Sequence, residues 1–94
     1  TVAEVWAAKA ALNGKEVVVR GKVVKFLGGI MGRNWVHIQD GTGAEGANDL
    51  TATTDQTAAV GDVVTIKGML AVDKDFGSGY MYAVIVEDAK VVKK

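Results

Sequence analysis

One glycine-centred pattern occurs twice in this sequence and constrains the fold more than any other feature. The segments 14–23 and 61–70 both read G-x-x-V-x-[VI]-[RK]-G-x-[VL]. Each predicts a β-strand that turns one face toward a core and places Arg20 or Lys67 on the other face. Because a glycine inside a strand costs stability, its place at the same point of two long strands indicates a sharp bend. Strands that bend in this way are what a small closed barrel requires. The predicted inward positions are Val17, Val19, Gly21, Val23, Val64, Ile66, Gly68 and Leu70.

Three further segments complete a set of five predicted strands. Residues 34–40 alternate, with Val36 and Ile38 on one face and Trp35, His37 and Gln39 on the other. Residues 48–53 predict a third strand with Leu50 and Ala52 inward, and about 80–91 predict the last strand, with a kink near 87–88. Residues 54–60 predict a connector with at most one helical turn.

A short amphipathic helix is predicted over residues 2–12. Thr1-x-x-Glu4 is a capping box, and Asn13-Gly14 supplies a left-handed stop. The helix is too short to persist alone, so we expect it to cover an open end of the barrel. Its predicted apolar stripe comprises Val2, Val5, Ala8 and Leu12, with Trp6 beside it.

Composition bounds the class of protein. With 94 residues, 49% of them apolar, the chain fits one domain with a modest core, which we divide into residues 1–13 (helix) and 14–94 (barrel). Eleven basic and eleven acidic residues cancel, so a polyanionic partner would need a local patch. No segment predicts membrane insertion. The absence of cysteine leaves both periplasmic and cytoplasmic locations open.

The segments 21–43, 61–68 and 75–80, with a W-x-H-x-x-D-G-T-G run at 35–43, resemble small bacterial OB-fold domains of the nucleic-acid-binding (DNA-binding protein-like) type. The resemblance implies an all-β, five-stranded OB-fold Greek-key barrel with a short N-terminal α-helix. It also implies single-stranded nucleic acid as a partner and suggests a periplasmic location. Many OB-folds carry a full helix between their third and fourth strands. The short connector here leaves that role to the N-terminal helix.

OB-folds hold single strands by stacking bases on aromatic rings within a cationic groove. On that model Trp35 and His37 share the binding face, the hairpin around 28–32 brings basic residues, and the loop near 74–82 adds rings. We therefore expect weak binding with little sequence preference. The candidate nucleic-acid-binding residues are Lys25, Phe26, Arg33, Trp35, His37, Lys74, Phe76, Tyr80 and Tyr82.

The same residues have a second interpretation. Trp35 then covers the outer barrel surface beneath the helix or a long loop, and Tyr80 and Tyr82 are ordinary cross-strand partners. Phosphates would be repelled by acidic residues that border the predicted face, namely Asp40, Glu45, Asp49 and Asp55. The alternative function is a periplasmic interaction domain that binds a peptide, a small ligand or a protein partner.

The sequence offers little basis for an enzyme, metal or cofactor site. His37 and Ser78 are the only histidine and serine, and no nucleophile-elbow motif surrounds the serine. The Asp73–Gly79 run has Val84 where a calcium loop needs its twelfth-position glutamate. The glycine-rich segment 28–32 does not contain the lysine of a phosphate loop, so its glycines indicate flexible hinge positions. We therefore expect a non-enzymatic binding module without a cofactor.

Overall fold

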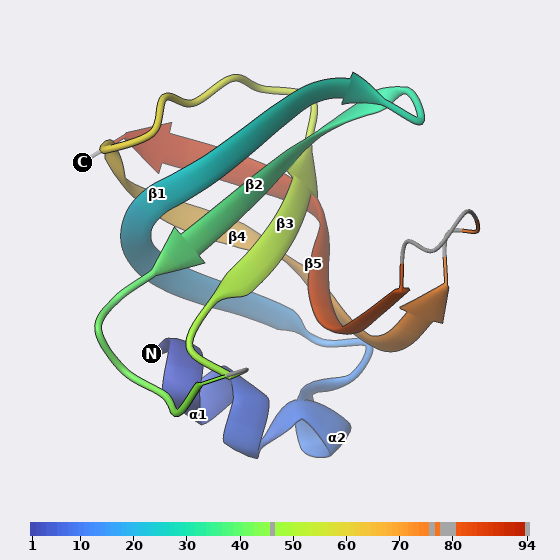
Figure 1. Ribbon diagram of the computed structural model, residues 1–94. Helices are drawn as coiled ribbons and strands as arrows, with labels where there is room; N and C mark the ends of the chain where they lie inside the picture. The colour runs from blue at the N-terminus through green and yellow to red at the C-terminus, as the bar shows by residue number, and fades with distance from the viewer. Residues whose placement is uncertain (46, 76, 78–80, 94) are drawn as a thin grey trace.

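The fold is a closed barrel of five strands, β1 (Glu16–Ile30), β2 (Arg33–Gln39), β3 (Leu50–Thr54), β4 (Val63–Asp75) and β5 (Met81–Lys93). Their order around the barrel is β1-β2-β3-β5-β4, and β4 returns to pair with β1 (Figure 1). β3 and β5 run parallel, whereas the other neighbours are antiparallel. This computed structural model describes residues 1–45, 47–75, 77 and 81–93. The prediction of an all-β five-stranded barrel behind a short N-terminal helical segment is confirmed.

The two glycine-centred strands pair with each other and bend as predicted. All eight predicted inward positions are buried, while Arg20 and Lys67 are exposed. Gly21 pairs with Val64, and Gly68 pairs with Val17. The part of β1 before Gly21 pairs with β4, and the part after Gly21 pairs with β2. The bend at Gly21 therefore lets one strand form two sides of the barrel. The inward faces of all five strands then meet in a single aliphatic core.

β5 contains a bulge where the sequence predicts a kink. The pairing with β4 passes from Lys67↔Lys90 to Met69↔Glu87, so two residues of β5 lie opposite Gly68. One of them, Asp88, has φ +51°, a left-handed value that is uncommon for a residue other than glycine. The Asp88 N–H donates to Thr53 Oγ1 at 3.2 Å, which ties the bulge to β3.

The N-terminal segment forms two short helices, α1 (Val2–Ala7) and α2 (Lys9–Leu12), instead of one continuous helix. The Thr1/Glu4 capping box is present, and Gly14 has the expected positive φ of 80°. The predicted inward position of Ala8 is wrong: it stands at the break between the helices and is exposed. Val2 and Val5 nevertheless join the barrel core, with Leu12 and Trp6 packed against it.

Hydrogen bonds hold α1 against one end of the barrel (Figure 1). The Val2 N–H donates to Asp40 Oδ2 at 2.9 Å, and the Ala3 N–H donates to Thr42 Oγ1 at 3.0 Å. Burial alone would raise the pKa of Asp40, but hydrogen bonds from Thr42 and the Val2 amide outweigh it and lower that pKa. The loop after β2 therefore supplies the capping groups that fix the helix position.

Candidate functional site

The outer face of β2 brings several predicted site residues together. His37 pairs with Lys25 of β1 on one side and with Thr51 of β3 on the other. Tyr82 of β5 lies close to two outward side chains of β2. Its ring centroid is 5.6 Å from that of Trp35, with the planes 26° apart, and 6.4 Å from that of His37.

The expectation that the Trp35 indole is open to a guest is wrong. The side chain is only 1% exposed, stacks against Tyr82 and donates its Nε1–H to the Ile30 carbonyl at 2.8 Å. The alternative interpretation, in which Trp35 is covered on the outer barrel surface by the helix or a long loop, is confirmed for the burial of the indole. Its stacking partner comes from β5 and not from the N-terminal helix. Base stacking on this indole would require Tyr82 to leave.

The remaining predicted residues do not form one cationic groove. Phe26 is partly buried and packs against the core, so only part of its ring remains open as the predicted second platform. Lys74 pairs with Tyr82 across β4 and β5, and its Nζ lies 3.6 Å from a Glu87 carboxylate oxygen, which offsets its charge. Phe76 and Tyr80 lie outside the described residues.

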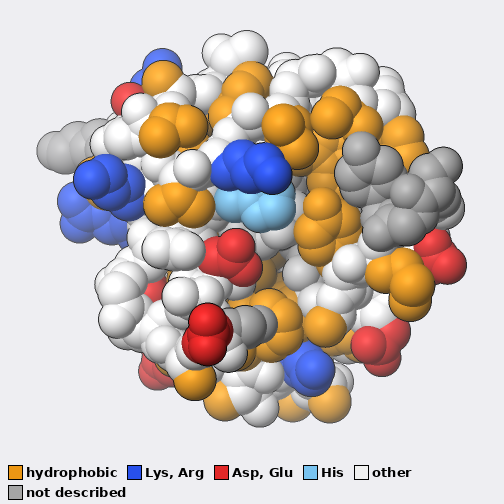
Figure 2. All heavy atoms as spheres, viewed as in Figure 1, with side chains coloured by type: hydrophobic (Ala, Val, Ile, Leu, Met, Phe, Trp, Pro, Cys, Tyr) orange, Lys and Arg blue, Asp and Glu red, His pale blue; other side chains and the backbone are white. Residues whose placement is uncertain are grey.

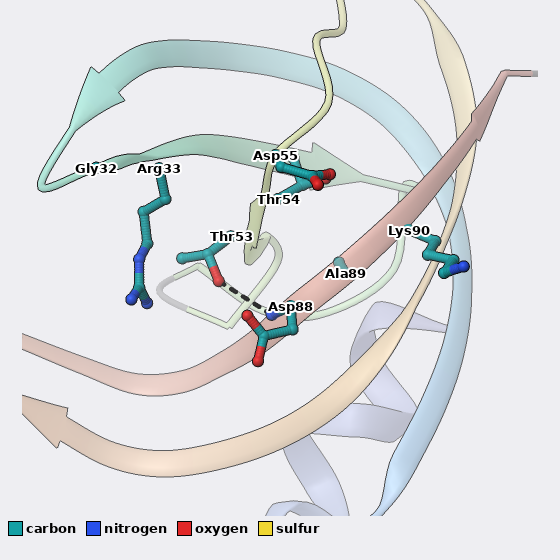
Figure 3. A pocket seen from close by; sticks show the side chains of 8 residues that line it. All are labelled: Gly32, Arg33, Thr53, Thr54, Asp55, Asp88, Ala89 and Lys90. Atoms are coloured by element: carbon teal, nitrogen blue, oxygen red, sulfur yellow. Dashed lines mark hydrogen bonds between the residues drawn. The ribbon is translucent and has the colours of Figure 1, made fainter.

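Arg33 lines a separate hollow of about 310 Å³ between β3 and the bulge of β5 (Figure 3). Asp55, Asp88 and Lys90 line it too, so two acidic residues accompany two basic ones. Figure 3 shows the Asp88 amide bonded to Thr53 across this hollow. The mixture of charges gives the hollow no clear preference for an anion.

A smaller hollow of about 260 Å³ lies where α1 meets the barrel, and sequence reasoning did not predict it. The Trp6 Nε1–H donates to the Asp49 carbonyl at 2.7 Å, which fixes the indole as one wall. Lys9 Nζ lies 5.6 Å from the Trp6 ring centroid. The only sequence signal was a tryptophan placed beside the helix stripe instead of within it. We call this the His37 hollow. Its lining residues are Trp6, His37, Asp49, Thr51, Met81, Tyr82, Ala83 and Val84.

His37 gives the hollow a specific polar group. Its side chain is 14% exposed, with Nδ1 3.2 Å from Thr51 Oγ1 and 3.8 Å from Asp49 Oδ2. Its Nε2 is buried and has no hydrogen-bond partner in the described part of the chain. Because Asp49 lies on the Nδ1 side, the ring proton is favoured on Nδ1, which leaves Nε2 as a hydrogen-bond acceptor. Figure 2 shows the imidazole in the middle of this face, between a basic and an acidic side chain.

The environment of His37 keeps it neutral. Burial lowers the pKa of His37, Lys25 lowers it further, and Asp49 opposes them in part. A group with a lowered folded pKa destabilises the fold as pH falls, because the unfolded chain takes up the proton first. We expect the unfolding free energy of the wild type, measured relative to His37→Gln, to decrease as pH falls below about 6.5. Urea titrations of both proteins between pH 8 and 5 measure it. A difference that stays constant or grows would contradict this assignment.

Comparison with known proteins assigns no family, since no family model matches the sequence and no curated protein matches it significantly. Within residues 1–45, 47–75, 77 and 81–93, no cluster of three or more His, Cys, Asp or Glu side chains could hold a metal ion. No described helix is long and apolar enough to cross a membrane. Ser78, the nucleophile weighed with His37, lies outside the described residues. The site must therefore be judged from its own chemistry.

Proposed function

We propose that this chain is a non-enzymatic interaction domain that binds a peptide segment in the His37 hollow. The observation that supports it is His37, which lines a hollow with Trp6 and Tyr82 and whose buried Nε2 has no hydrogen-bond partner among the described residues. A buried acceptor without a partner is costly, and a ligand N–H would satisfy it once the side chains that cover Nε2 move aside. The aromatic walls would take the apolar part of the same side chain.

The size of the hollow favours a single side chain over an enclosed small molecule. Its volume of about 260 Å³ is below the roughly 300–1,000 Å³ of sites that enclose whole ligands. Carboxylate, hydroxyl and imidazole groups of Asp49, Thr51 and His37 supply mostly acceptors. The fitting group is an apolar side chain that ends in, or contains, an N–H donor.

The neighbouring edge of β5 suits an extended peptide. Pairing of β5 with β3 covers Thr51↔Ile85 and Ala52↔Val86, whereas pairing with β4 extends back to Met81. Within the described residues, the β3-facing edge before Ile85 therefore pairs with no strand, and it borders the hollow. A peptide strand added at such an edge gains backbone hydrogen bonds while one side chain enters the pocket.

Two small probes test this proposal by chemical-shift titration. N-acetyl-tryptophanamide, which carries an indole N–H, is expected to bind and to shift the His37, Trp6 and Tyr82 signals. N-acetyl-phenylalaninamide, which lacks that donor, is expected to bind about fivefold more weakly. His37→Phe removes the acceptor and is expected to abolish this difference, whereas the exposed control Val60→Ser leaves it unchanged.

Single-stranded nucleic acid, which the sequence resemblance implies, is the competing proposal. Its test is a labelled oligothymidine titrated at two salt concentrations, because phosphate contacts weaken with salt. Salt-dependent binding that moves the His37 and Tyr82 signals would support it. Equal affinity of the two amide probes, together with such binding, would reject the peptide proposal.

A further inference from the structure

A second surface lies on the outer sides of β1, β4 and β5, away from the His37 hollow. The strand register places Val18 beside Lys67 and Lys67 beside Lys90. The next row holds Arg20, Thr65 and Val92, and the row after it holds Lys22 and Val63. Since alternate residues of a strand share a face, these side chains point outward together. We call this the basic face, made of Val18, Arg20, Lys22, Val63, Thr65, Lys67, Lys90 and Val92.

Aliphatic side chains on this face are unusually open to solvent. Val18 is 60% exposed, Val63 41% and Val92 63%. Single exposed valines are ordinary, but three on one sheet face form an apolar surface that gains free energy when it is covered. Val18 and Val63 each pair with a lysine, and Arg20 stands in the same row as Val92, beyond Thr65.

The charge of the basic face is of one sign. It carries Arg20, Lys22, Lys67 and Lys90 and no acidic residue, although the whole chain is neutral. Carboxylates lie at its borders: Asp40 lines a hollow with Arg20, Lys22 and Val63, and Asp88 lines one with Lys90. At a third point Glu16 Oε1 lies 3.8 Å from Lys67 Nζ. That pair is more than half exposed on both sides and contributes little. A local cationic patch therefore exists, on a different side of the barrel from the one predicted.

We propose that the basic face docks an acidic, aliphatic segment of another protein. A single nucleic acid strand would need rings for base stacking, and none of the eight residues is aromatic. A membrane surface favours an apolar face separated from the charges, whereas here valines and cations are mixed within the same rows. A second copy of the same face would oppose like charges. An extended segment whose barrel-facing side chains, two residues apart, include both carboxylate and aliphatic groups matches the mixture of cations and valines on this face.

The test uses a labelled peptide that repeats two glutamates followed by two valines, so that each face of the extended chain carries both residue types, with fluorescence anisotropy as the readout. We expect binding that weakens with added salt, and Arg20→Glu to weaken it about tenfold or more, because that change places like charges together. The control Lys15→Glu makes the same change in net charge at an exposed residue outside the basic face, and we expect less than a twofold effect. Val18→Thr, which keeps the shape but adds a hydroxyl, is expected to weaken binding severalfold without changing the salt dependence.

Other probes decide against the proposal. No binding of the glutamate–valine peptide, or equal effects of Arg20→Glu and Lys15→Glu, would overturn it. Tighter binding of an oligothymidine or of phosphatidylserine vesicles than of the peptide, lost in Arg20→Glu, would assign the face to nucleic acid or lipid instead. None of these outcomes depends on the His37 hollow, so the two proposals can fail separately.

Discussion

Replacing Trp35 by alanine is expected to lower the free energy of unfolding by about 3–5 kcal/mol, the usual cost of deleting a buried tryptophan or phenylalanine side chain. The indole is 1% exposed and stacks on Tyr82, so the variant leaves a cavity between β2 and β5. It also loses the hydrogen bond from Nε1 to the Ile30 carbonyl, near the β1–β2 hairpin. Urea unfolding followed by circular dichroism measures the change.

Trp35→Phe is the matched variant for this prediction. It keeps a ring against Tyr82 but removes the Nε1–H donor to Ile30. We expect it to cost clearly less than the alanine variant, because most of the buried ring surface remains. If Trp35→Ala leaves stability unchanged within about 1 kcal/mol and weakens only ligand binding, the indole is an accessible platform and the buried arrangement is incorrect.

The fold could be predicted because the sequence repeats a local rule along each strand. Alternation decides which side chains share a face, and a mid-strand glycine decides where the strand bends. Both rules depend on near neighbours in the chain, and they place Val17, Ile66 and Leu70 correctly in the core. The kink predicted near residues 87–88 coincides with the bulge of β5.

The candidate site was harder to predict because it depends on what covers each face. Alternation puts Trp35 on the outer side of β2, but only the tertiary structure shows that Tyr82 stacks on it. Ion pairs are hidden from the sequence for the same reason. The register of β4 and β5 brings Lys74 close to Glu87, and the spacing of the two residues along the chain does not predict this contact. Trp6 became a wall of the His37 hollow because its Nε1–H reaches the Asp49 carbonyl.

The basic face is a second feature that depends on the tertiary structure. Arg20 and Lys67 were predicted to point outward and do so. Only the pairing of β1 with β4 shows that the two cations belong to one positively charged face. Net charge averages over the whole chain and conceals such a patch. A neutral composition therefore restricts long-range attraction without excluding a local docking surface.

Gly68→Ala is expected to destabilise the barrel by about 3 kcal/mol, at the upper end of the cost of overpacking. A Cβ at Gly68 would lie 2.7 Å from the Glu87 carbonyl oxygen and 3.0 Å from the Ala89 Cα, both in the backbone of the β5 bulge. Backbone held by strand pairing on both sides cannot move away cheaply.

Gly21→Ala is the matched variant. Its Cβ would meet the Gln39 carbonyl oxygen at 3.0 Å and Ile38 side-chain atoms at 3.2 Å, so we expect about 1 kcal/mol. Chemical denaturation of both variants measures the difference. If the two variants lose the same unfolding free energy, the backbone of the β5 bulge moves to admit the methyl group, which would contradict this prediction.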